Sequence, residues 1–215
     1  GISPFIGPSF NEEEIKKQIN SFKLNYSIPK KIEKDIASEI KHKKIVGIFF
    51  DKAEYGQRSL GNRSILADPR NKSSKVMLNQ KIKKRDWFMP FAPAILDECY
   101  SKYFNCQNPS YYMQKAVRIK DKVLKSIPSA VHVDKTSRVQ FVDKKISPKF
   151  WRIINEFYKI SGIPVVLNTS FNRHGISTIS SPRQAIEHLL EGCMDYLIIS
   201  NYVISAKDNR KFNRK

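Results

Sequence analysis

Cysteine is scarce in this sequence, and long apolar runs are absent. The three cysteines, Cys99, Cys106 and Cys193, are too few and too irregularly spaced for a disulfide framework or a zinc knuckle. We expect reduced thiols in a cytoplasmic protein. No apolar run reaches the roughly 18 residues of a membrane span, and Gly1-Ile2-Ser3-Pro4 lacks the basic region of a signal peptide. The chain opens without methionine, so we expect a piece of a longer protein.

Acidic residues are few relative to basic ones. The chain has 20 Asp and Glu against 39 Lys and Arg, which gives a formal net charge of +19. Such a charge predicts attraction to polyanions, for example nucleotides, RNA or an acidic membrane surface. Lysine outnumbers arginine, and asparagine and isoleucine are abundant, so a solvated surface set by composition bias is the alternative. The charge alone leaves both interpretations open.

Familiar catalytic groupings are missing as well. The sequence has no G-x-S-x-G nucleophile elbow and no convincing Cys–His or Ser–His–Asp arrangement. His174 follows Ser170 across a turn, which is no evidence of a dyad. His132 and Asp134 share a face of an expected strand, but no further ligand lies at useful spacing, so we expect no metal site. Many fixed cations and few bases suit chemistry by charge neutralisation, such as transfer at a nucleotide phosphorus.

The stretch G-Q-R-S-L-G-N-R-S, residues 56–64, nearly spells a phosphate-binding loop. Gly56 and Gly61 have the Walker A spacing, but Asn62-Arg63-Ser64 follows where Lys-Ser/Thr is required, which excludes that loop. A strand, two glycines and then a helix would still suit an anion cradle of backbone amides. Arg58, Arg63 and Arg70 lie within thirteen residues, and the alternative is a turn whose arginines pair with nearby acids, namely Glu54, Asp68 or Asp86.

Two further polar stretches are candidates for binding. K-I-K-K-R-D, residues 81–86, places four cations at the end of an expected helix, where they either bind an anion or complement the helix dipole. L-N-T-S-F-N, residues 167–172, continues a buried strand into polar side chains. Ligands of α/β sheets bind beyond the carboxyl ends of strands, although Asn and Ser also form simple turns there.

The periodicity predicts a mixed α/β domain. An N-terminal helical segment covers residues 1–44, the main domain covers 45–205, and a basic tail at 206–215 is expected to be disordered. Within them we expect helices near 12–22, 29–40, 71–86, 97–104, 147–162 and 181–192. Strands are expected at 44–50, 91–96, 112–119, 163–168 and 195–204, with a hairpin formed by 129–134 and 138–143.

Five blocks in order resemble the C-terminal region of the O-carbamoyltransferase family, which includes nodulation and antibiotic-tailoring carbamoyltransferases. They are EYGQRSLGNRSILADPR, KIKKRDWFMPFAPAIL, HVDKTSRVQF, IPVVLNTSFNRHG and SPRQAIEHLL. The resemblance implies a YrdC-like domain, a twisted mixed sheet with helices around a basic cleft. It also implies ATP, with Mg²⁺, and carbamoyl phosphate as ligands that form a carbamoyl-adenylate. A separate N-terminal ASKHA-like domain with an iron-type metal passes the carbamoyl group to a hydroxyl. This sequence lacks that domain, so we expect incomplete transfer activity from the chain alone.

The resemblance also implies site residues. Arg58 matches the arginine of G-P-R-A-L-G, where this chain has Gln57 and Ser59. Lys83 and Arg138 match the other two cations, and these three are the expected catalytic residues. The expected nucleotide- or carbamoyl-binding residues are Arg63, Arg85, Asn168, Thr169, Ser170 and Asn172.

One departure from the family pattern concerns a phosphate contact. Met89 stands where many relatives have a basic residue before P-F-A-P, so either Lys84 or Arg85 compensates or the chain belongs to a subgroup. A different class of function also stays open, a non-catalytic basic module that binds RNA. Polyanion binding through many phosphates weakens about 10³–10⁵-fold between 50 and 200 mM salt, whereas a pocket with a few oriented contacts loses much less.

Overall fold

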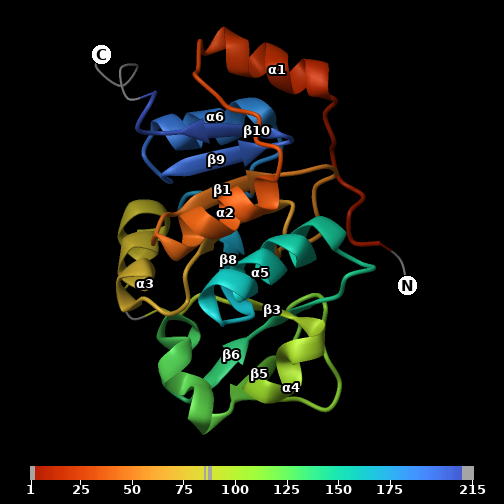
Figure 1. Cartoon of the computed structure of the whole chain (residues 1–215), viewed down its shortest axis with the longest axis vertical. Helices are drawn as coiled ribbons and strands as arrows, with labels where there is room; N and C mark the ends of the chain where they lie inside the picture. The colour runs from red at the N-terminus through yellow and green to blue at the C-terminus, as the bar shows by residue number, and fades with distance from the viewer. Residues whose placement is uncertain (1–2, 85, 87–88, 210–215) are drawn as a thin grey trace.

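The chain, seen in a computed structural model that describes residues 3–84, 86 and 89–209, is built on a mixed sheet (Figure 1). Its seven strands run in the order β10-β9-β1-β2-β8-β3-β7. β1 is parallel to β9 and β3 to β7, and the other pairs are antiparallel. The strand bounds are β1 Val46–Phe49, β2 Arg63–Ala67, β3 Pro93–Leu96, β7 Gln140–Val142, β8 Val165–Ser170, β9 Tyr196–Ile199 and β10 Tyr202–Ser205. The predicted mixed α/β class is confirmed.

A second, smaller sheet lies at one end of the main one (Figure 1). It contains β4 (Phe104–Asn105), β5 (Ala116–Ile119) and β6 (Thr136–Arg138), all antiparallel. Opposed residues of β5 and β6 point to the same face. The face with Val117, Ser137 and Ile119 is buried, and the face with Arg118 and Arg138 is exposed. The small sheet therefore presents arginines outward.

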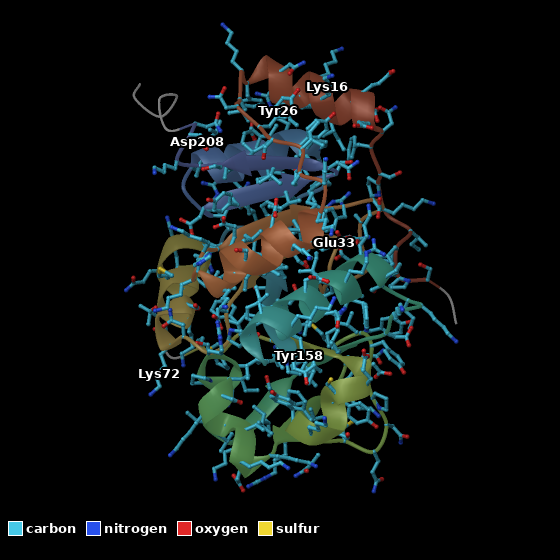
Figure 2. The ribbon with its side chains drawn as sticks, in the orientation of Figure 1. Lys16, Tyr26, Glu33, Lys72, Tyr158 and Asp208 are labelled. Carbon is cyan, nitrogen blue, oxygen red and sulfur yellow. The ribbon has the colours of Figure 1, made fainter. Side chains whose placement is uncertain are left out.

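Helices cover both faces of the main sheet. α2 (Ile32–Lys41) and α5 (Pro148–Ser161) pack against each other on the near face, and α6 (Pro182–Leu190) lies behind β9 and β10 (Figure 1). Glu33 of α2, labelled in Figure 2, accepts a hydrogen bond from Arg152 Nε of α5 at 2.7 Å. The remaining helical segments are α1 Glu12–Ser21, α3 Lys72–Leu78 with the π-helix Asn79–Lys83, α4 Tyr100–Tyr103, and the 3₁₀ turns Asp97–Cys99, Asp121–Ser126 and Pro128–Ala130.

Local sequence signals set several helix ends as predicted. The side chains of Asn11 and Glu14 form a capping box on α1, and those of Ser181 and Gln184 form one on α6. α5 has proline in its first turn and ends at Gly162, whose φ of 74° is left-handed. The predicted Ser147 cap is wrong in one respect, because its side chain makes no capping hydrogen bond.

Three sequence-based assignments are wrong where tertiary pairing decides. The expected hairpin at 129–143 does not form, because β6 pairs with β5 in the small sheet while β7 pairs with β3 in the main sheet. The expected single strand at 195–204 is a hairpin, β9 and β10, turning at Ser200 with a φ of 53°. The segment after Gly61 is strand β2 rather than a helix, because it pairs with both β1 and β8.

Both ends of the chain join the main core. Ile15 and Ile19 of α1 and Ile36 and Ile40 of α2 are buried in the same cluster as the sheet, although α2 begins at Ile32 rather than at Pro29. In the tail, Asn209 is 1% exposed and bonds Asn25 through both ends of its amide. The prediction of disorder is therefore wrong for residues 206–209, and 210–215 lie outside the described residues. No helix of the described part is long and apolar enough to cross a membrane.

Gly61 has both a backbone and a packing requirement for glycine. Its φ is +118°, and a Cβ there would come 2.5 Å from the ring of Phe150 on α5. Gly56 has a φ of +99° but nothing within 4 Å of the same position. We expect Gly61→Ala to cost about 2–5 kcal/mol of unfolding free energy and Gly56→Ala about 1–2 kcal/mol, because only the first adds a clash to the strain. Urea unfolding of the two variants measures this difference, and equal losses would contradict it.

His188 makes stability depend on pH. It is 4% exposed, its Nδ1 lies 2.8 Å from the Gln184 carbonyl oxygen, and burial lowers its pKa. The unfolded chain then binds a proton more readily than the folded one, so stability falls as pH drops below about 6.5. We expect His188→Gln to reduce the loss of thermal stability between pH 7 and pH 5. The matched control is His42→Gln at an exposed position, which should leave that loss unchanged.

Candidate functional site

Two adjoining cavities lie where β8 ends beside the loop between β1 and β2. Counted as all the space not filled by atoms, including the part open to solvent, their volumes are about 1180 and 990 Å³. The larger is bordered on its other sides by β6 and by residues 89–92. Both are lined by Gln57, Arg58, Ser59, Ser170 and Asn172. These residues therefore form a wall common to the two cavities, and a ligand in one lies beside a ligand in the other.

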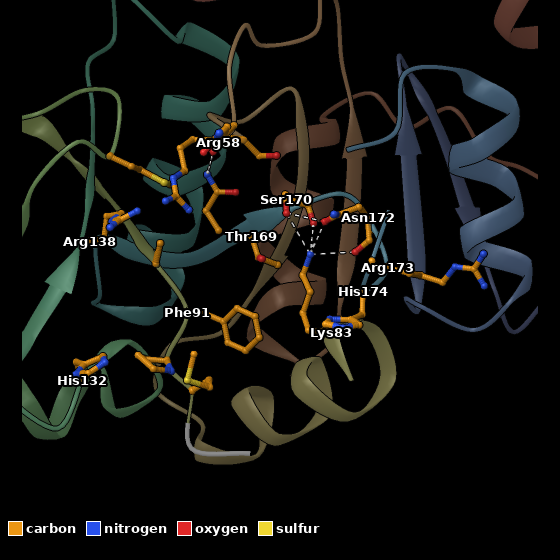
Figure 3. A pocket seen from close by; sticks show the side chains of 18 residues that line it. Arg58, Lys83, Phe91, His132, Arg138, Thr169, Ser170, Asn172, Arg173 and His174 are labelled. Atoms are coloured by element: carbon orange, nitrogen blue, oxygen red, sulfur yellow. Dashed lines mark hydrogen bonds between the residues drawn. The ribbon is translucent and has the colours of Figure 1, made fainter. Parts of the chain in front are cut away.

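Lys83 lines the larger cavity, and hydrogen bonds to Ser170 and Asn172 hold its ammonium group in place. It ends the π-helix Asn79–Lys83, and Lys84 then turns with a φ of 41°. Lys83 Nζ donates to Ser170 Oγ at 3.1 Å and to its carbonyl oxygen at 2.9 Å. It also donates to Asn172 Oδ1 at 2.6 Å and to its carbonyl oxygen at 3.0 Å (Figure 3). Three residues predicted from two separate sequence blocks are thus brought into one cluster.

Arg58 and Arg138 line the same cavity from the side opposite Lys83 (Figure 3). Both side chains are exposed, and within the part of the chain that the structure describes neither has a hydrogen bond or ion pair. Arg138 comes from the outward face of β6, and Arg58 from the tip of the β1–β2 loop. Their guanidinium groups are available for a ligand.

Sequence reasoning missed one further cation, Arg173, which also lines the larger cavity. The signal was its place directly after the L-N-T-S-F-N block. Arg173 Nη1 pairs with Glu191 at 2.9 Å. Among the described residues that line this cavity none is acidic, while four are fixed cations. A cavity of one charge sign concentrates anions and stabilises the charge that develops on them.

The second half of the β1–β2 loop is not a free cradle for phosphate. The Glu54 carboxylate accepts hydrogen bonds from the backbone amides of Leu60 at 2.8 Å, Asn62 at 2.7 Å and Arg63 at 3.1 Å. The amide of Gly61 donates to Ser64 Oγ at 3.1 Å. The amides of residues 60–63 are therefore already satisfied by the protein itself, and the side chain of Arg58 extends from the other half of the loop.

Arg63 is an expected nucleotide- or carbamoyl-binding residue, but its side chain is buried and bonds the backbone. It is 0% exposed and stacks 3.6 Å from the centre of the Phe49 ring. Its Nη1 donates to the carbonyl oxygens of Phe50 and Asn62, and its Nη2 to those of Pro8 and Asp51. Burial lowers its pKa to about 10, so it stays charged at neutral pH. Although Arg63 borders the smaller cavity, its donors at Nη1 and Nη2 are used by the backbone.

Arg70, which follows the 56–64 stretch, forms an ion pair with Asp68, as the alternative interpretation of this region predicts. Arg70 Nη2 lies 2.6 Å from Asp68, and this pairing raises the pKa of Arg70. Of the other expected residues, Asn168 and Thr169 line the larger cavity, as does Met89, which is 38% exposed. Arg85 lies outside the described residues. His132 also borders this cavity, with Nδ1 3.4 Å from Asp134.

The family model described as Carbamoyltransferase C-terminus matches residues 37–206. The MJ1058 protein of Methanocaldococcus jannaschii is 35% identical over 95% of this chain and 34% of its own length. The nodulation protein NolO of Bradyrhizobium diazoefficiens is 32% identical over 94% of this chain and 38% of its own. The chain thus spans about a third of these curated relatives.

Solved structures of HypF share the fold. Full-length HypF in a phosphate- and nucleotide-bound form has a TM-score of 0.58 at 20% identity, covering 80% of this chain and 25% of HypF. HypF of T. kodakarensis has a TM-score of 0.54 at 17% identity, covering 85% of this chain and 22% of its own. With the five ordered sequence blocks and the matched length, these findings show that the chain belongs to the carbamoyltransferase family and corresponds to its C-terminal domain.

Proposed function

We propose that the two cavities bind ATP and carbamoyl phosphate and that a carbamoyl-adenylate forms between them. The observation that carries this proposal is the larger cavity, where Arg58, Lys83 and Arg138 face a space whose described lining also includes Arg173 and holds no acid. Both substrates are phosphate anions, and guanidinium groups match phosphate oxygens in shape and charge. Membership of the family supports a transferase role, and the HypF structure with phosphate and nucleotide bound supports such a use of this fold.

The chemistry needs charge neutralisation more than proton transfer. Water cleaves carbamoyl phosphate into carbamate and phosphate. An oxygen of the carbamate then attacks the α-phosphorus of ATP, while the bond from that phosphorus to the pyrophosphate oxygen breaks. Arg58 and Arg138, on one side, and Lys83, on the other, offset the negative charge that spreads over the phosphate oxygens. Ser170 and Asn172, held by Lys83, orient the ligand by hydrogen bonds.

Mg²⁺ fits this site only as a companion of the triphosphate. Among the described residues no group of three His, Cys, Asp or Glu side chains could hold a metal ion. The triphosphate oxygens would therefore supply its ligands, and Mg²⁺ would neutralise part of their charge.

The second half of the transfer lies with the rest of the full-length enzyme. This chain corresponds to about a third of its relatives, so a separate ASKHA-like domain would choose the hydroxyl acceptor and receive the carbamoyl group. Cytoplasmic location stays a prediction from the sequence. RNA binding has less support, because Arg58 and Arg138, which have no partner among the described residues, both line one cavity.

The proposal is tested by ATP–pyrophosphate exchange driven by carbamoyl phosphate in the complete enzyme. We expect Arg138→Ala and Lys83→Ala each to slow exchange by roughly 10–10³-fold, which corresponds to about 1.5–4 kcal/mol of transition-state stabilisation. Arg118→Ala is the matched control, since Arg118 is an exposed arginine on the neighbouring strand that lines neither cavity.

Arg138 gives the decisive result, because it is exposed and its loss should not affect folding. Lys83→Ala also removes the link between the π-helix and β8, so its melting temperature must be measured alongside its activity. Exchange at the wild-type rate in Arg138→Ala would show that this cavity is not where adenylation occurs.

A further inference from the structure

Two buried polar atoms in the cavity wall have no hydrogen-bond partner among the described residues. They are Ser59 Oγ and Asn168 Oδ1. Ser59 is 4% exposed and Asn168 is 1% exposed, and both residues line the larger cavity. A buried polar group left unpaired costs about 1–3 kcal/mol, so such groups are rare unless something else satisfies them. Two of them in one ligand-sized cavity point to a ligand that completes the wall.

The surrounding hydrogen bonds determine what that ligand must offer. Asn168 Nδ2 donates to the Ser59 carbonyl oxygen at 3.1 Å and to Gln140 Oε1 at 2.9 Å, while Gln140 Nε2 donates to the Leu60 carbonyl oxygen at 2.9 Å. Rotating the Asn168 amide by half a turn would place its oxygen against two other acceptors. Asn168 Oδ1 is therefore held as an acceptor that needs an N–H or O–H donor. Ser59 Oγ can either donate or accept.

Phosphate oxygens are acceptors at neutral pH and cannot satisfy Asn168. The amide of carbamoyl phosphate carries two N–H donors and one carbonyl acceptor in a single plane. Ser59 also borders the smaller cavity, which Glu54 lines as well. The Glu54 carboxylate is engaged by backbone amides, so Arg58, Ser170 and Asn172 are the groups there that suit the phosphate of the same small molecule. In an inference that rests on the proposed function, we infer that Asn168 Oδ1 and Ser59 Oγ recognise the amide group of carbamoyl phosphate by hydrogen bonds. Asn168 accepts one N–H, and Ser59 binds the second N–H or the carbonyl oxygen.

The loop around Ser59 can admit a ligand at this wall. Residues 55–58 are exposed, and Gly56 has open space around it, whereas Leu60 and Asn62 are anchored to Glu54. Both polar atoms are covered by the protein, and the Ser59 carbonyl oxygen is bonded to Asn168 Nδ2, so the substrate reaches them only when the exposed residues 55–58 move aside. Ser59 stands where the family block G-P-R-A-L-G has alanine, so a smaller side chain is compatible with this position.

The consequence is discrimination between two acyl phosphates of nearly equal shape. Acetyl phosphate has a methyl group in place of the amide nitrogen. It would cover Asn168 Oδ1 without giving it a donor, and sites built around a hydrogen bond reject ligands that lack the donor. We expect carbamoyl phosphate to bind the wild-type chain about 10–100-fold more tightly than acetyl phosphate.

Calorimetric titration of the 215-residue chain tests this directly, with carbamoyl phosphate, acetyl phosphate and ATP as separate ligands. We expect Ser59→Ala to weaken carbamoyl phosphate by roughly 3–10-fold and to leave acetyl phosphate unchanged, because only the amide uses the hydroxyl. Ser177→Ala is the control, since that exposed hydroxyl borders only the smaller cavity. Its affinity ratio should equal that of the wild type.

Each other outcome has a separate meaning. Equal affinities for the two acyl phosphates, with carbamoyl-phosphate-driven exchange intact in the full-length enzyme, would overturn this assignment and leave the proposed function standing. A Ser59→Ala effect on ATP alone would place the amino group of adenine, not the carbamoyl amide, at this wall, and would also overturn it. No binding of carbamoyl phosphate together with no exchange would overturn the proposed function and this inference with it.

Discussion

The buried guanidinium of Arg63 is the interaction on which the rest of the site depends. It donates to carbonyl oxygens from three separate stretches, at Pro8, at Phe50 and Asp51, and at Asn62. A buried cation is costly unless its hydrogen bonds are made, and here backbone oxygens and the face of Phe49 supply the stabilisation. The N-terminal segment is thereby tied to the central strands, and the loop that carries Arg58 starts and ends at fixed points.

Glu54 complements Arg63 on the same loop. Its carboxylate takes the amides of Leu60, Asn62 and Arg63, and the charge of Glu54 also favours the charged form of Arg63. Glu54 and Arg63 thus stabilise the loop, while the Arg58 guanidinium at its tip has no partner among the described residues and can bind a ligand. A sequence that resembles a phosphate-binding loop here forms a turn whose second half is bonded to Glu54, with Arg58 exposed at its tip.

Sequence patterns predicted well wherever the determining interaction is local. The capping boxes of α1 and α6 and the end of α5 at Gly162 follow from residues within one or two turns of the helix end. Sequence patterns failed where a strand pairs with a strand that is distant in the sequence. β6 and β7 are consecutive in the chain, but their partners β5 and β3 lie in different sheets, and an alternating pattern carries no information about the partner.

The sequence by itself determined the family, the excess of fixed cations and most of the binding candidates, because these depend on residue types and on ordered motifs. Tertiary structure alone decided which arginines are free. Arg63 and Arg58 lie five positions apart in one motif, yet one is enclosed by backbone carbonyls and the other faces a cavity. Only folding brings Lys83 to Ser170 and leaves Asn168 Oδ1 without a partner among the described residues, because those contacts join segments far apart in the chain.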